Sequence, residues 1–278
     1  VWKKNEYLEY FRSTSFSMRI ATWNINSVRL RIHHVLRFIK EQNIDVMCLQ
    51  ETKTEDQFFP ITEFNEVGMN YYVLRGEKSY NGVAILSKVP IIKDYFKYWC
   101  GFEDTRHVFA VLENKIAIHN FYVPAGGDIP DIKINKKFDH KLRFVNEMID
   151  FFNKQKPTYT VLVGDFNIAP FENDVWSHKQ LLNVVSHTPI ETDLLIKLMK
   201  DSNWIDVGRK YFSKDEKLYS WWSYRNRDWK KSNRGRRLDH IWISEDLENS
   251  LKSYLSCKET RDWEKPSDHV PLILELST

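Results

Sequence analysis

The stretch VLVGDFNIAP at residues 161–170 begins as an apolar strand and ends in polar residues. Residues 161–163 are strong strand formers, and Gly164 ends the apolar run directly before Asp165 and Asn167. Successive side chains of an extended segment point to opposite faces, so Asp165 and Asn167 project from the same face. The stretch therefore predicts a buried strand that carries two polar groups to one edge of a sheet.

Further strand-like runs, rich in β-branched and aromatic residues, recur along the chain. Segments with the helical spacing of apolar residues separate some of these runs, whereas other runs follow one another directly. This order favours an α/β fold with mixed sheets and helices outside, and no repeat or Pro/Gly-rich linker divides the chain. The predicted strands are 19–24, 45–50, 82–87, 107–113, 115–123, 158–164, 238–244 and 269–276, and the predicted helices are 29–42, 139–154 and 191–200.

Polar residues stand at the ends of six predicted strands, and the edge of an α/β sheet is where ligands usually bind. Each motif alone has a commoner explanation, because Asp-x-Asn after a strand is usually a turn or a helix cap. Their joint occurrence favours one shared site. The residues are Asn24, Gln50 with Glu51, Tyr122, Asp165 with Asn167, Asp239, and Asp268 with His269.

These side chains are suited to a hard divalent cation. Mg²⁺ takes oxygen ligands and is commonly held by one or two carboxylates together with substrate phosphate. No Cys/His cluster offers a competing zinc site. His269, with a carboxylate behind it, is suited to proton transfer or to contact with a phosphate. The oxygen ligands come from Asn24, Glu51, Asp165, Asn167 and Asp268.

Composition and charge exclude several other classes of protein. The chain has 278 residues, of which 42% are hydrophobic, and a formal net charge of only +3. It contains no run of roughly 20 apolar residues, the length that a membrane span requires. Its three cysteines form no CxxC motif, which favours reduced thiols and a cytoplasmic location. Residues 1–17 contain no apolar segment typical of a secretory signal and are expected to be a flexible extension, with Met18 as an alternative start.

A basic and aromatic segment lies near the C-terminal end of the sequence. Residues 225–237 contain seven Lys or Arg against one acidic residue, Asp228. Clustered cations neutralise phosphates, and neighbouring aromatic rings can stack on bases or fill the space of a missing base. The alternative is a solvated basic loop beside core tryptophans. The aromatic residues within or beside the segment are Trp221, Trp222, Tyr224 and Trp229.

Eight motifs appear in an order that resembles the exonuclease III family of abasic-site DNA repair endonucleases, within the endonuclease/exonuclease/phosphatase superfamily. The resemblance extends from Met18 to Leu276. LQETK, GDFN and PSDH point to the superfamily, whereas SWWSYR and the NRG block point to its DNA repair branch. The motifs are TWNINSVR (22–29), LQETK (49–53), YNGVAILSK (80–88), FYVPAGG (121–127), VGDFNIAP (163–170), SWWSYR (220–225), NRGRRLDHIW (233–242) and KPSDHVP (265–271).

The resemblance implies a four-layered α/β sandwich of two packed mixed β-sheets flanked by helices. Because the family's site residues come from both ends of the chain, it implies a single catalytic domain over residues 18–278. It also implies incision of duplex DNA on the 5′ side of abasic sites, with 3′→5′ exonuclease and 3′-end cleaning activity. The implied cofactor is Mg²⁺, with Mn²⁺ as an alternative, and the expected state is a monomer on cytoplasmic, nucleoid-associated DNA without contact to a membrane.

The resemblance also implies roles for the residues at the strand ends. Glu51 would be the main metal ligand, aided by Asn24 and Asp268. Asp165 would orient or deprotonate the attacking water, with Asn167 contacting phosphate or metal. The remaining roles are phosphate or leaving-group contact for Tyr122, phosphate contact, proton transfer or metal binding for His269, and orientation of the His269 ring for Asp239.

DNA would be held by cations and aromatic residues outside this group. Trp221 matches the tryptophan that lines the family's pocket for the base-free sugar. The other expected DNA contacts are Arg29, Lys53, Arg225, Arg234 and Arg236. Two alternatives remain at this point: a superfamily relative that hydrolyses phospholipid or inositol phosphates, and an inert DNA-binding module on the same scaffold.

Overall fold

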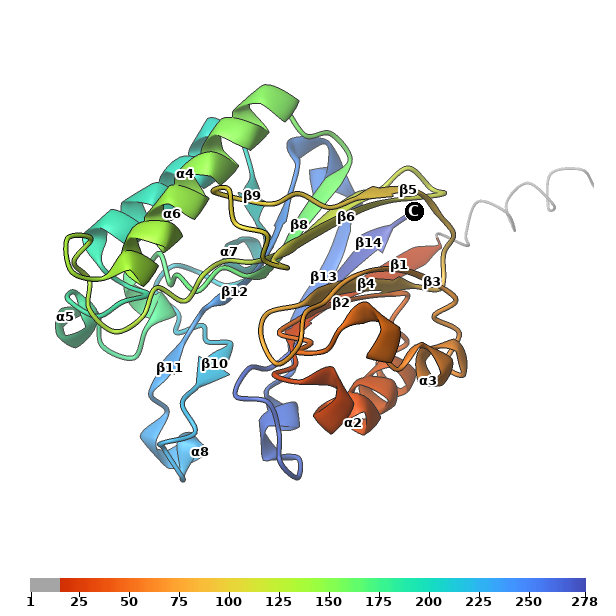
Figure 1. The fold of residues 1–278 in the computed structure, drawn as a ribbon, viewed down its shortest axis with the longest axis horizontal. Helices are drawn as coiled ribbons and strands as arrows, with labels where there is room; N and C mark the ends of the chain where they lie inside the picture. Colours follow the sequence, from red (N-terminus) through yellow and green to blue (C-terminus); the bar gives the residue numbers. More distant parts are fainter. Residues whose placement is uncertain (1–15) are drawn as a thin grey trace, which may run out of the picture.

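A computed structural model describes residues 16–278 of the chain (Figure 1). Residues 1–15, most of the predicted flexible extension, lie outside that range. The first strand, β1 (Ser17–Asn24), already includes Ser17, which pairs with Ser277. The backbone N–H of Thr278 donates to the carbonyl of Phe16 at 2.9 Å. Phe16 and Ser17, the last two residues of the predicted extension, are therefore hydrogen-bonded or paired to the C-terminal strand.

Two six-stranded sheets form the centre of the molecule. In each sheet one pair of strands, β1–β2 and β7–β8, is parallel, and the other neighbouring strands are antiparallel. Both sheets are therefore mixed, as predicted. The first sheet runs β13 (Leu251–Ser256), β14 (Leu272–Ser277), β1, β2 (Val46–Gln50), β4 (Val83–Ser87) and β3 (Tyr71–Arg75), and the second runs β5 (Ile91–Tyr95), β6 (His107–Leu112), β7 (Ala117–Tyr122), β8 (Thr160–Asp165), β12 (Asp239–Ile243) and β9 (Ile205–Asp206).

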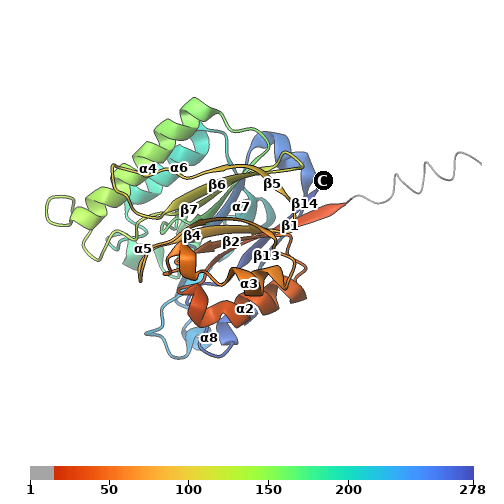
Figure 2. The same ribbon diagram turned by 45° about the vertical axis from the view of Figure 1, so that its right-hand side comes forward.

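Helices cover the outer face of each sheet. Figures 1 and 2 show α2 (Val28–Glu41) and α3 (Ile61–Asn65) below the first sheet, with α4 (Lys136–Gln155) and α6 (Pro189–Asp201) above the second. Side chains cap the N-termini of two long helices. The Ser27 side chain accepts from the N–H of Leu30 at the start of α2, and the Asn135 side chain accepts from the N–H groups of Lys137 and Phe138 at the start of α4. The order helices, sheet, sheet, helices confirms the predicted four-layered α/β sandwich.

The main core lies between the two sheets, and strand periodicity decides what reaches it. In β1, Ile20 packs between the sheets, whereas Ala21 and Trp23 pack against the helix side. In β8, Val161 and Val163 pack between the sheets, whereas Leu162 faces the helix layer. Alternation of side chains along a strand therefore directs the even-numbered residues of β1 and the odd-numbered residues of β8 into the gap between the sheets.

Short elements complete the chain. A two-stranded ribbon, β10 (Trp221–Trp222) and β11 (Gly235–Arg236), carries α8 (Trp229–Ser232) and projects from the lower edge in Figure 1. The predicted strand 269–276 begins later, at Leu272, directly after Pro271, which lacks an N–H for the ladder. Among the described residues no helix has the length and apolar composition needed to cross a bilayer. The other short helices are η1 (Asp56–Phe58), η2 (Glu172–Asp174), α5 (His178–Leu181), α7 (Val207–Tyr211), η3 (Glu245–Ser250) and η4 (Lys258–Asp262).

Candidate active site

The predicted site residues of four strands point into the gap between the sheets. Asn24 shares its face of β1 with the core residue Ile20, and Asp165 shares its face of β8 with Val163. The same alternation applies to two further strands of the second sheet, where Tyr122 ends β7 and Asp239 begins β12. Because β8 and β12 are antiparallel, Asp239 pairs in register with Asp165. The strand pattern therefore brings these residues to one edge of the gap.

Asn24 connects the two sheets at this edge. Its Nδ2 donates to Oε1 of Glu51 at 2.9 Å and to Oδ2 of Asp165 at 2.8 Å. The side chain is fully buried, and Ser267 Oγ donates to its backbone carbonyl at 2.6 Å. Two carboxylates from different sheets thus lie within hydrogen-bond reach of one amide nitrogen.

Glu51 follows β2 in a left-handed backbone conformation, with a φ of 49°. Its Oε1 also accepts a hydrogen bond from the Tyr122 hydroxyl at 2.9 Å, and its Oε2 lies 2.9 Å from Lys53 Nζ. Burial raises the pKa of Glu51, but the hydrogen bond from Asn24 and the charge of Lys53 outweigh it, so the net shift is downward. Glu51 is therefore an ionised carboxylate at neutral pH.

His269 is held between two buried carboxylates. Its Nδ1 lies 2.7 Å from Asp239 Oδ2, and its Nε2 lies 3.7 Å from Asp165 Oδ2. Burial lowers the pKa of His269, but Asp239 and Asp165 raise it more, so the net shift is upward. Asp239 is itself fixed by the Ser220 hydroxyl, which donates to its Oδ2 at 2.7 Å.

Asp165 is almost fully buried, and burial raises its pKa. Its Oδ1 accepts from the backbone N–H of Asn167 at 2.9 Å, so the loop after β8 closes on the strand end. A Cβ on Gly164 would lie 1.9 Å from the carbonyl oxygen of Phe121, and its φ is 144°. Only glycine allows β7 and β8 to approach so closely there.

The oxygen donors at this edge fit a divalent cation. One atom each of Asp165, Asp239 and His269 lies within 4.8 Å of the other two, but Asp239 already serves as the partner of His269 and Ser220. Glu51 is a better ligand for a cation, because it is ionised and it lines the same pocket as the carboxylate of Asp268. Carboxylate and amide oxygens with room for waters match the preference of Mg²⁺.

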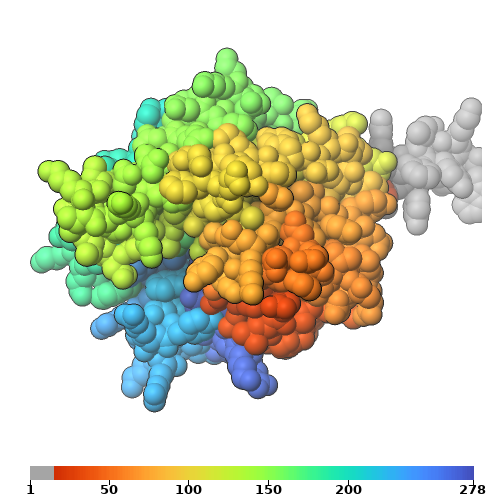
Figure 3. All heavy atoms as spheres, viewed as in Figure 1, coloured from red at the N-terminus to blue at the C-terminus, as the bar shows by residue number. Residues whose placement is uncertain are grey.

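A groove of about 520 Å³ opens at this edge and is lined by Glu51 and His269 and by three arginines of the basic segment. Trp221 donates from Nε1 to Asp268 Oδ2 at 2.9 Å, which joins the ribbon to the site. In Figure 3 the segment that contains β10, α8 and β11, coloured light blue, projects next to the red and orange N-terminal region. The predicted site residues that line the groove are Glu51, Tyr122, Asn167, Trp221, Arg225, Arg234, Arg236, Asp268 and His269.

Two arginine–tryptophan pairs form one wall of this groove. The guanidinium of Arg236 lies 5.2 Å from the ring centroid of Trp221, and that of Arg234 lies 4.8 Å from Trp176. Arg236 also donates to the Ser186 hydroxyl at 2.9 Å. These contacts hold both cations and both rings at the groove surface.

Two predicted DNA contacts lie apart from the groove lining. Arg29 is exposed in the first turn of α2. Lys53 contacts Glu51 and donates to Asn26 Oδ1 at 2.7 Å, so its ammonium group is paired within the site. Asn26 in turn donates to Asp268 Oδ1 at 3.4 Å.

Several residues at the site were not predicted. Ser220 opens the SWWSYR motif, but the motif does not indicate its hydrogen bond to Asp239, and Trp176 lies outside the motifs. Arg106 lies with its guanidinium 5.0 Å from the Tyr122 ring and lines a second hollow of about 750 Å³ beside the groove. Lys78, Lys137 and His140 line the same hollow. Only the fold brings these residues next to Tyr122.

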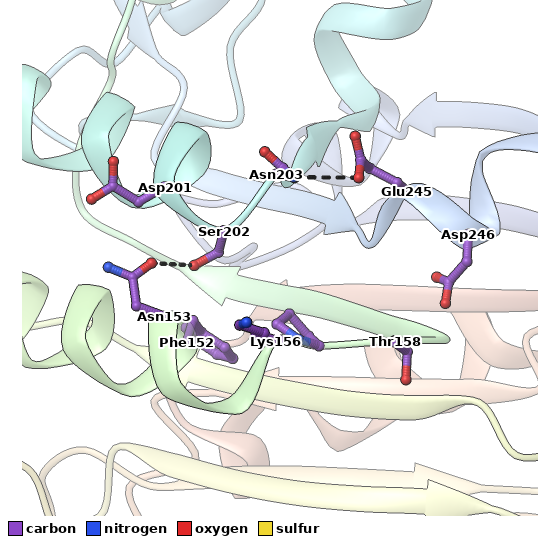
Figure 4. A pocket seen from close by; sticks show the side chains of 10 residues that line it. Phe152, Asn153, Lys156, Thr158, Asp201, Ser202, Asn203, Glu245 and Asp246 are labelled. Atoms are coloured by element: carbon purple, nitrogen blue, oxygen red, sulfur yellow. Dashed lines mark hydrogen bonds between the residues drawn. The ribbon is translucent and has the colours of Figure 1, made fainter.

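A separate pocket of about 490 Å³ lies at the opposite end of β8 from Asp165 (Figure 4). Four of its polar side chains form two pairs, Ser202 with Asn153 and Asn203 with Glu245. It contains none of the predicted site residues, and its lining is acidic as well as polar. This pocket is not a candidate for the phosphate chemistry.

Comparison with known proteins agrees with this arrangement. Residues 21–269 match the sequence model described as the Endonuclease/Exonuclease/phosphatase family. Exodeoxyribonuclease III of Haemophilus influenzae is 30% identical over 274 residues, covering 93% of this chain and 99% of that protein. The exodeoxyribonuclease of Bacillus subtilis is 26% identical, covering 92% of this chain and 98% of that protein.

Solved structures show the same fold. An AP endonuclease from Archaeoglobus fulgidus superposes with a TM-score of 0.86 at 31% identity, covering 94% of this chain and all of that chain. A 3′-5′ exonuclease from Neisseria meningitidis gives the same TM-score at 28% identity, again covering 94% of this chain and 100% of its own. These likenesses extend over both sheets and their helices.

Proposed function

The chain belongs to the Endonuclease/Exonuclease/phosphatase family, and from this premise we propose that it is a Mg²⁺-dependent DNA repair phosphodiesterase. It cuts duplex DNA on the 5′ side of abasic sites and leaves a 3′-hydroxyl and a 5′-deoxyribose phosphate. The relatives that support a DNA substrate are exodeoxyribonucleases and AP endonucleases.

One observation carries this proposal. A single groove contains the carboxylates Glu51 and Asp268, the buried His269, and the arginine–tryptophan wall. Groups that hold a cation and groups that hold a nucleic acid thus open onto the same space. A phosphate of the DNA backbone held by the arginines would lie beside the carboxylates.

Glu51 and Asp268, with the amides of Asn24 and Asn167, are the residues that would hold the cation. A bound Mg²⁺ would supply positive charge that favours hydrolysis of a phosphodiester, and Mn²⁺ has similar ligand preferences. Asn24 keeps Glu51 turned toward the groove through its 2.9 Å contact with Oε1.

The reaction is the attack of water on phosphorus, in which a new P–O bond forms and the bond from phosphorus to the 3′ oxygen breaks. Asp165 orients the water and takes its proton, and its carboxylate is held by Asn24 and by the N–H of Asn167. The departing 3′ oxygen ends as a hydroxyl, so it gains one proton. Tyr122, whose hydroxyl now donates to Glu51, is one group at the site that can supply it.

His269 contacts a non-bridging oxygen of the phosphate. Its Nδ1–H is committed to Asp239, which leaves Nε2 on the side of Asp165 and the groove. An imidazolium stabilised by two carboxylates supplies positive charge where negative charge develops on the phosphate. Asp239 acts through His269 and is a positioning residue.

DNA is held through its backbone, largely without regard to sequence. Arg225, Arg234 and Arg236 supply phosphate contacts at the groove, and Trp221 offers a ring surface to a sugar that has lost its base. Removal of a 3′-terminal nucleotide or of a 3′-blocking group breaks the same kind of P–O bond, so 3′→5′ exonuclease and 3′-end cleaning share this site. We expect the protein to act as a monomer on nucleoid DNA in the cytoplasm.

The second candidate is a phosphatase or phospholipid phosphodiesterase of the same family. The basic wall of the groove, with two arginine–tryptophan pairs, favours an extended polyanion with aromatic bases over a single small headgroup. An inert DNA-binding module is the third. The hydrogen bond between His269 and Asp239, with the other ring nitrogen 3.7 Å from Asp165, argues against it, because binding alone does not require a buried histidine between two carboxylates.

The test is cleavage of an end-labelled duplex with one abasic site, in Mg²⁺ and then in EDTA, beside an undamaged duplex. Metal-dependent nicking directly 5′ of the lesion is the expected result. The proposal would be wrong if the folded protein does not nick this duplex with Mg²⁺ or Mn²⁺. Release of phosphate from lipid or inositol phosphates would then support the second candidate.

A further inference from the structure

A fully buried ion pair lies behind the loops that border the groove. Lys141 comes from α4 and Glu191 from α6, and neither side chain is exposed to solvent. The distance from Lys141 Nζ to Glu191 Oε1 is 2.5 Å. Neither residue lines the groove itself.

Lys141 also binds two loop carbonyls. Its Nζ donates to the carbonyl of Asn167 at 2.7 Å and to that of Ala125 at 3.1 Å. These carbonyls belong to the loops after β8 and β7. The three N–H donors of the ammonium are thus matched by three oxygen acceptors, so this buried cation is fully satisfied.

Glu191 holds a third loop. Its carboxylate accepts from the backbone N–H of Ser186 at 3.0 Å, and from the N–H and hydroxyl of Thr188 at 3.2 and 2.6 Å. Ser186 lines the groove and accepts a hydrogen bond from Arg236. The carbonyl of Ser186 accepts from the N–H of Ala169, which joins this loop to the one after β8.

Stability alone gives a weak reason for such a pair. Taking two charges out of water is costly, and well-packed apolar residues of similar volume are often as stable. An apolar pair, however, has no donors for the carbonyls of Ala125 and Asn167 and no acceptors for the N–H groups of Ser186 and Thr188. What the ion pair provides is the relative placement of three loops.

We propose that Lys141 and Glu191 are positioning residues for the hydrolytic reaction, because together they fix the loops that carry Asn167 and Ser186, two residues that line the groove. The inference rests on the proposed function. Asn167 has a φ of 52°, and its Nδ2 donates to the carbonyl of Val123 at 2.9 Å. Its amide N–H holds Asp165, so a movement of the Asn167 backbone changes the position of that carboxylate.

The loop after β7 is shaped around the lysine. A Cβ on Gly126 would lie 2.8 Å from Cδ of Lys141 and 3.1 Å from Val185, and the residue has a φ of 90°. Shortening or redirecting the lysine side chain removes the surface against which this loop rests. The same loop contributes Ala125 and Gly127 to the groove.

The experiment compares Lys141→Met with the double variant Lys141→Met/Glu191→Gln. Methionine keeps the length of the stem but removes the charge and the donors, which leaves Glu191 buried and unpaired, so the single variant should have a lower Tm. Glutamine at 191 removes the unpaired charge and keeps an oxygen for Ser186 and Thr188. The double variant should therefore regain most of the lost Tm.

Activity separates positioning from stability. We expect kcat on the abasic duplex to fall on the order of 10²-fold in both variants, with KM for DNA little changed, because a displacement of about 1 Å in a reacting group has that effect. The control is Lys97→Met, which breaks another ion pair of α4, with Glu147, and should keep the wild-type kcat and KM.

Each outcome decides something. A double variant that regains both Tm and kcat would reduce the pair to a stabilising element, and so would variants that fail to fold at all. A higher KM with an unchanged kcat would also overturn the inference. If the wild-type protein does not cleave DNA, the proposed function itself is wrong, whatever the variants do.

Discussion

Asp239 accepts a 2.7 Å hydrogen bond from Nδ1 of His269, and the other ring nitrogen of His269 then faces Asp165 at 3.7 Å. Asp239 and Asp165 are opposite one another in the β8–β12 ladder, so the position of the imidazole between them depends on the register of these two strands. A carboxylate behind a histidine selects one tautomer and fixes the ring. In this protein the ring nitrogen that remains available is the one on the groove side.

Replacing Asp239 with Asn should lower kcat on the order of 10²-fold, because the amide keeps the shape but loses the charge that stabilises the imidazolium. The ¹⁵N chemical shifts of His269 should show a lower pKa at the same time. Asp246→Asn, which alters an aspartate that binds the N–H of Tyr159 at the opposite end of β8, is the control. Wild-type kcat in Asp239→Asn would remove Asp239 from the proposed mechanism.

Asp165→Asn should reduce single-turnover cleavage by roughly 10²- to 10⁴-fold while DNA affinity stays close to that of the wild type. The asparagine oxygen can still accept from Asn24, so the fold and the groove should be preserved. Fluorescence anisotropy with a labelled abasic duplex measures affinity apart from turnover. Equal losses of binding and cleavage would mean that residue 165 supports the fold and not the water.

Glu51→Gln should raise the Mg²⁺ concentration needed for half-maximal activity about 10-fold or more, because a neutral amide is a poorer ligand than a carboxylate. Glutamine retains an acceptor for Asn24 and Tyr122, so the thermal stability should change little. A Mg²⁺ titration at fixed ionic strength makes the comparison. An unchanged half-saturation would assign the cation to other residues.

Trp221→Ala should weaken incision at an abasic site more than it weakens binding to undamaged duplex. The ring is half-buried in the groove, and loss of an aromatic contact with a nucleotide costs about 1–3 kcal/mol. The matched control is Arg225→Ala, which should lower affinity for both duplexes alike and reduce the slope of log K against log salt by about 0.9. A uniform loss in Trp221→Ala would make this ring a packing residue.

Two buried histidines should make the protein sensitive to acid. His107 Nε2 and His119 Nδ1 lie 2.9 Å apart, and burial lowers the pKa of both, that of His119 to about 3. Below about pH 6.5 these two histidines bind protons in the unfolded chain but stay neutral in the folded protein. The free energy of unfolding therefore falls as the pH drops toward about 3.

Each such histidine contributes a slope of about 1.4 kcal/mol per pH unit in that window. His119→Gln keeps a hydrogen-bonding partner for His107 and removes one titrating group, so its unfolding free energy should depend less on pH. Urea unfolding at several pH values between 4 and 7 measures both slopes. Equal slopes in the two proteins would show that His119 titrates normally.

The alternation of side chains explains why much of the arrangement follows from the sequence. All eight predicted strands are present, with ends shifted by a few residues. Because the side chains of a strand alternate between its two faces, Asn24 at the end of β1 faces the same side as Ile20, and Asp165 at the end of β8 faces the same side as Val163. Asn24 and Asp165 therefore meet as a consequence of the pattern that builds the core.

Edge strands and cross-chain contacts could not be predicted in the same way. Strands β3 and β5 lie at sheet edges, and their side chains are largely exposed, so no alternation marks them. Ser220 acts through a carboxylate 19 residues away, and Lys141 binds carbonyls 16 and 26 residues away, contacts that no local pattern in the sequence indicates. The same is true of Arg106, whose position beside Tyr122 depends on the pairing of β6 with β7.

The contact of Asn24 with Glu51 and Asp165 has a consequence for how the molecule matures. Its three members come from two separate sheets, and His269 joins them from a segment that is synthesised long after Asn24. A chain in which only one half has folded carries no complete set of these groups. The complete set of groups that the proposed reaction uses therefore forms only when the two halves have packed against each other, so a partly folded chain lacks it.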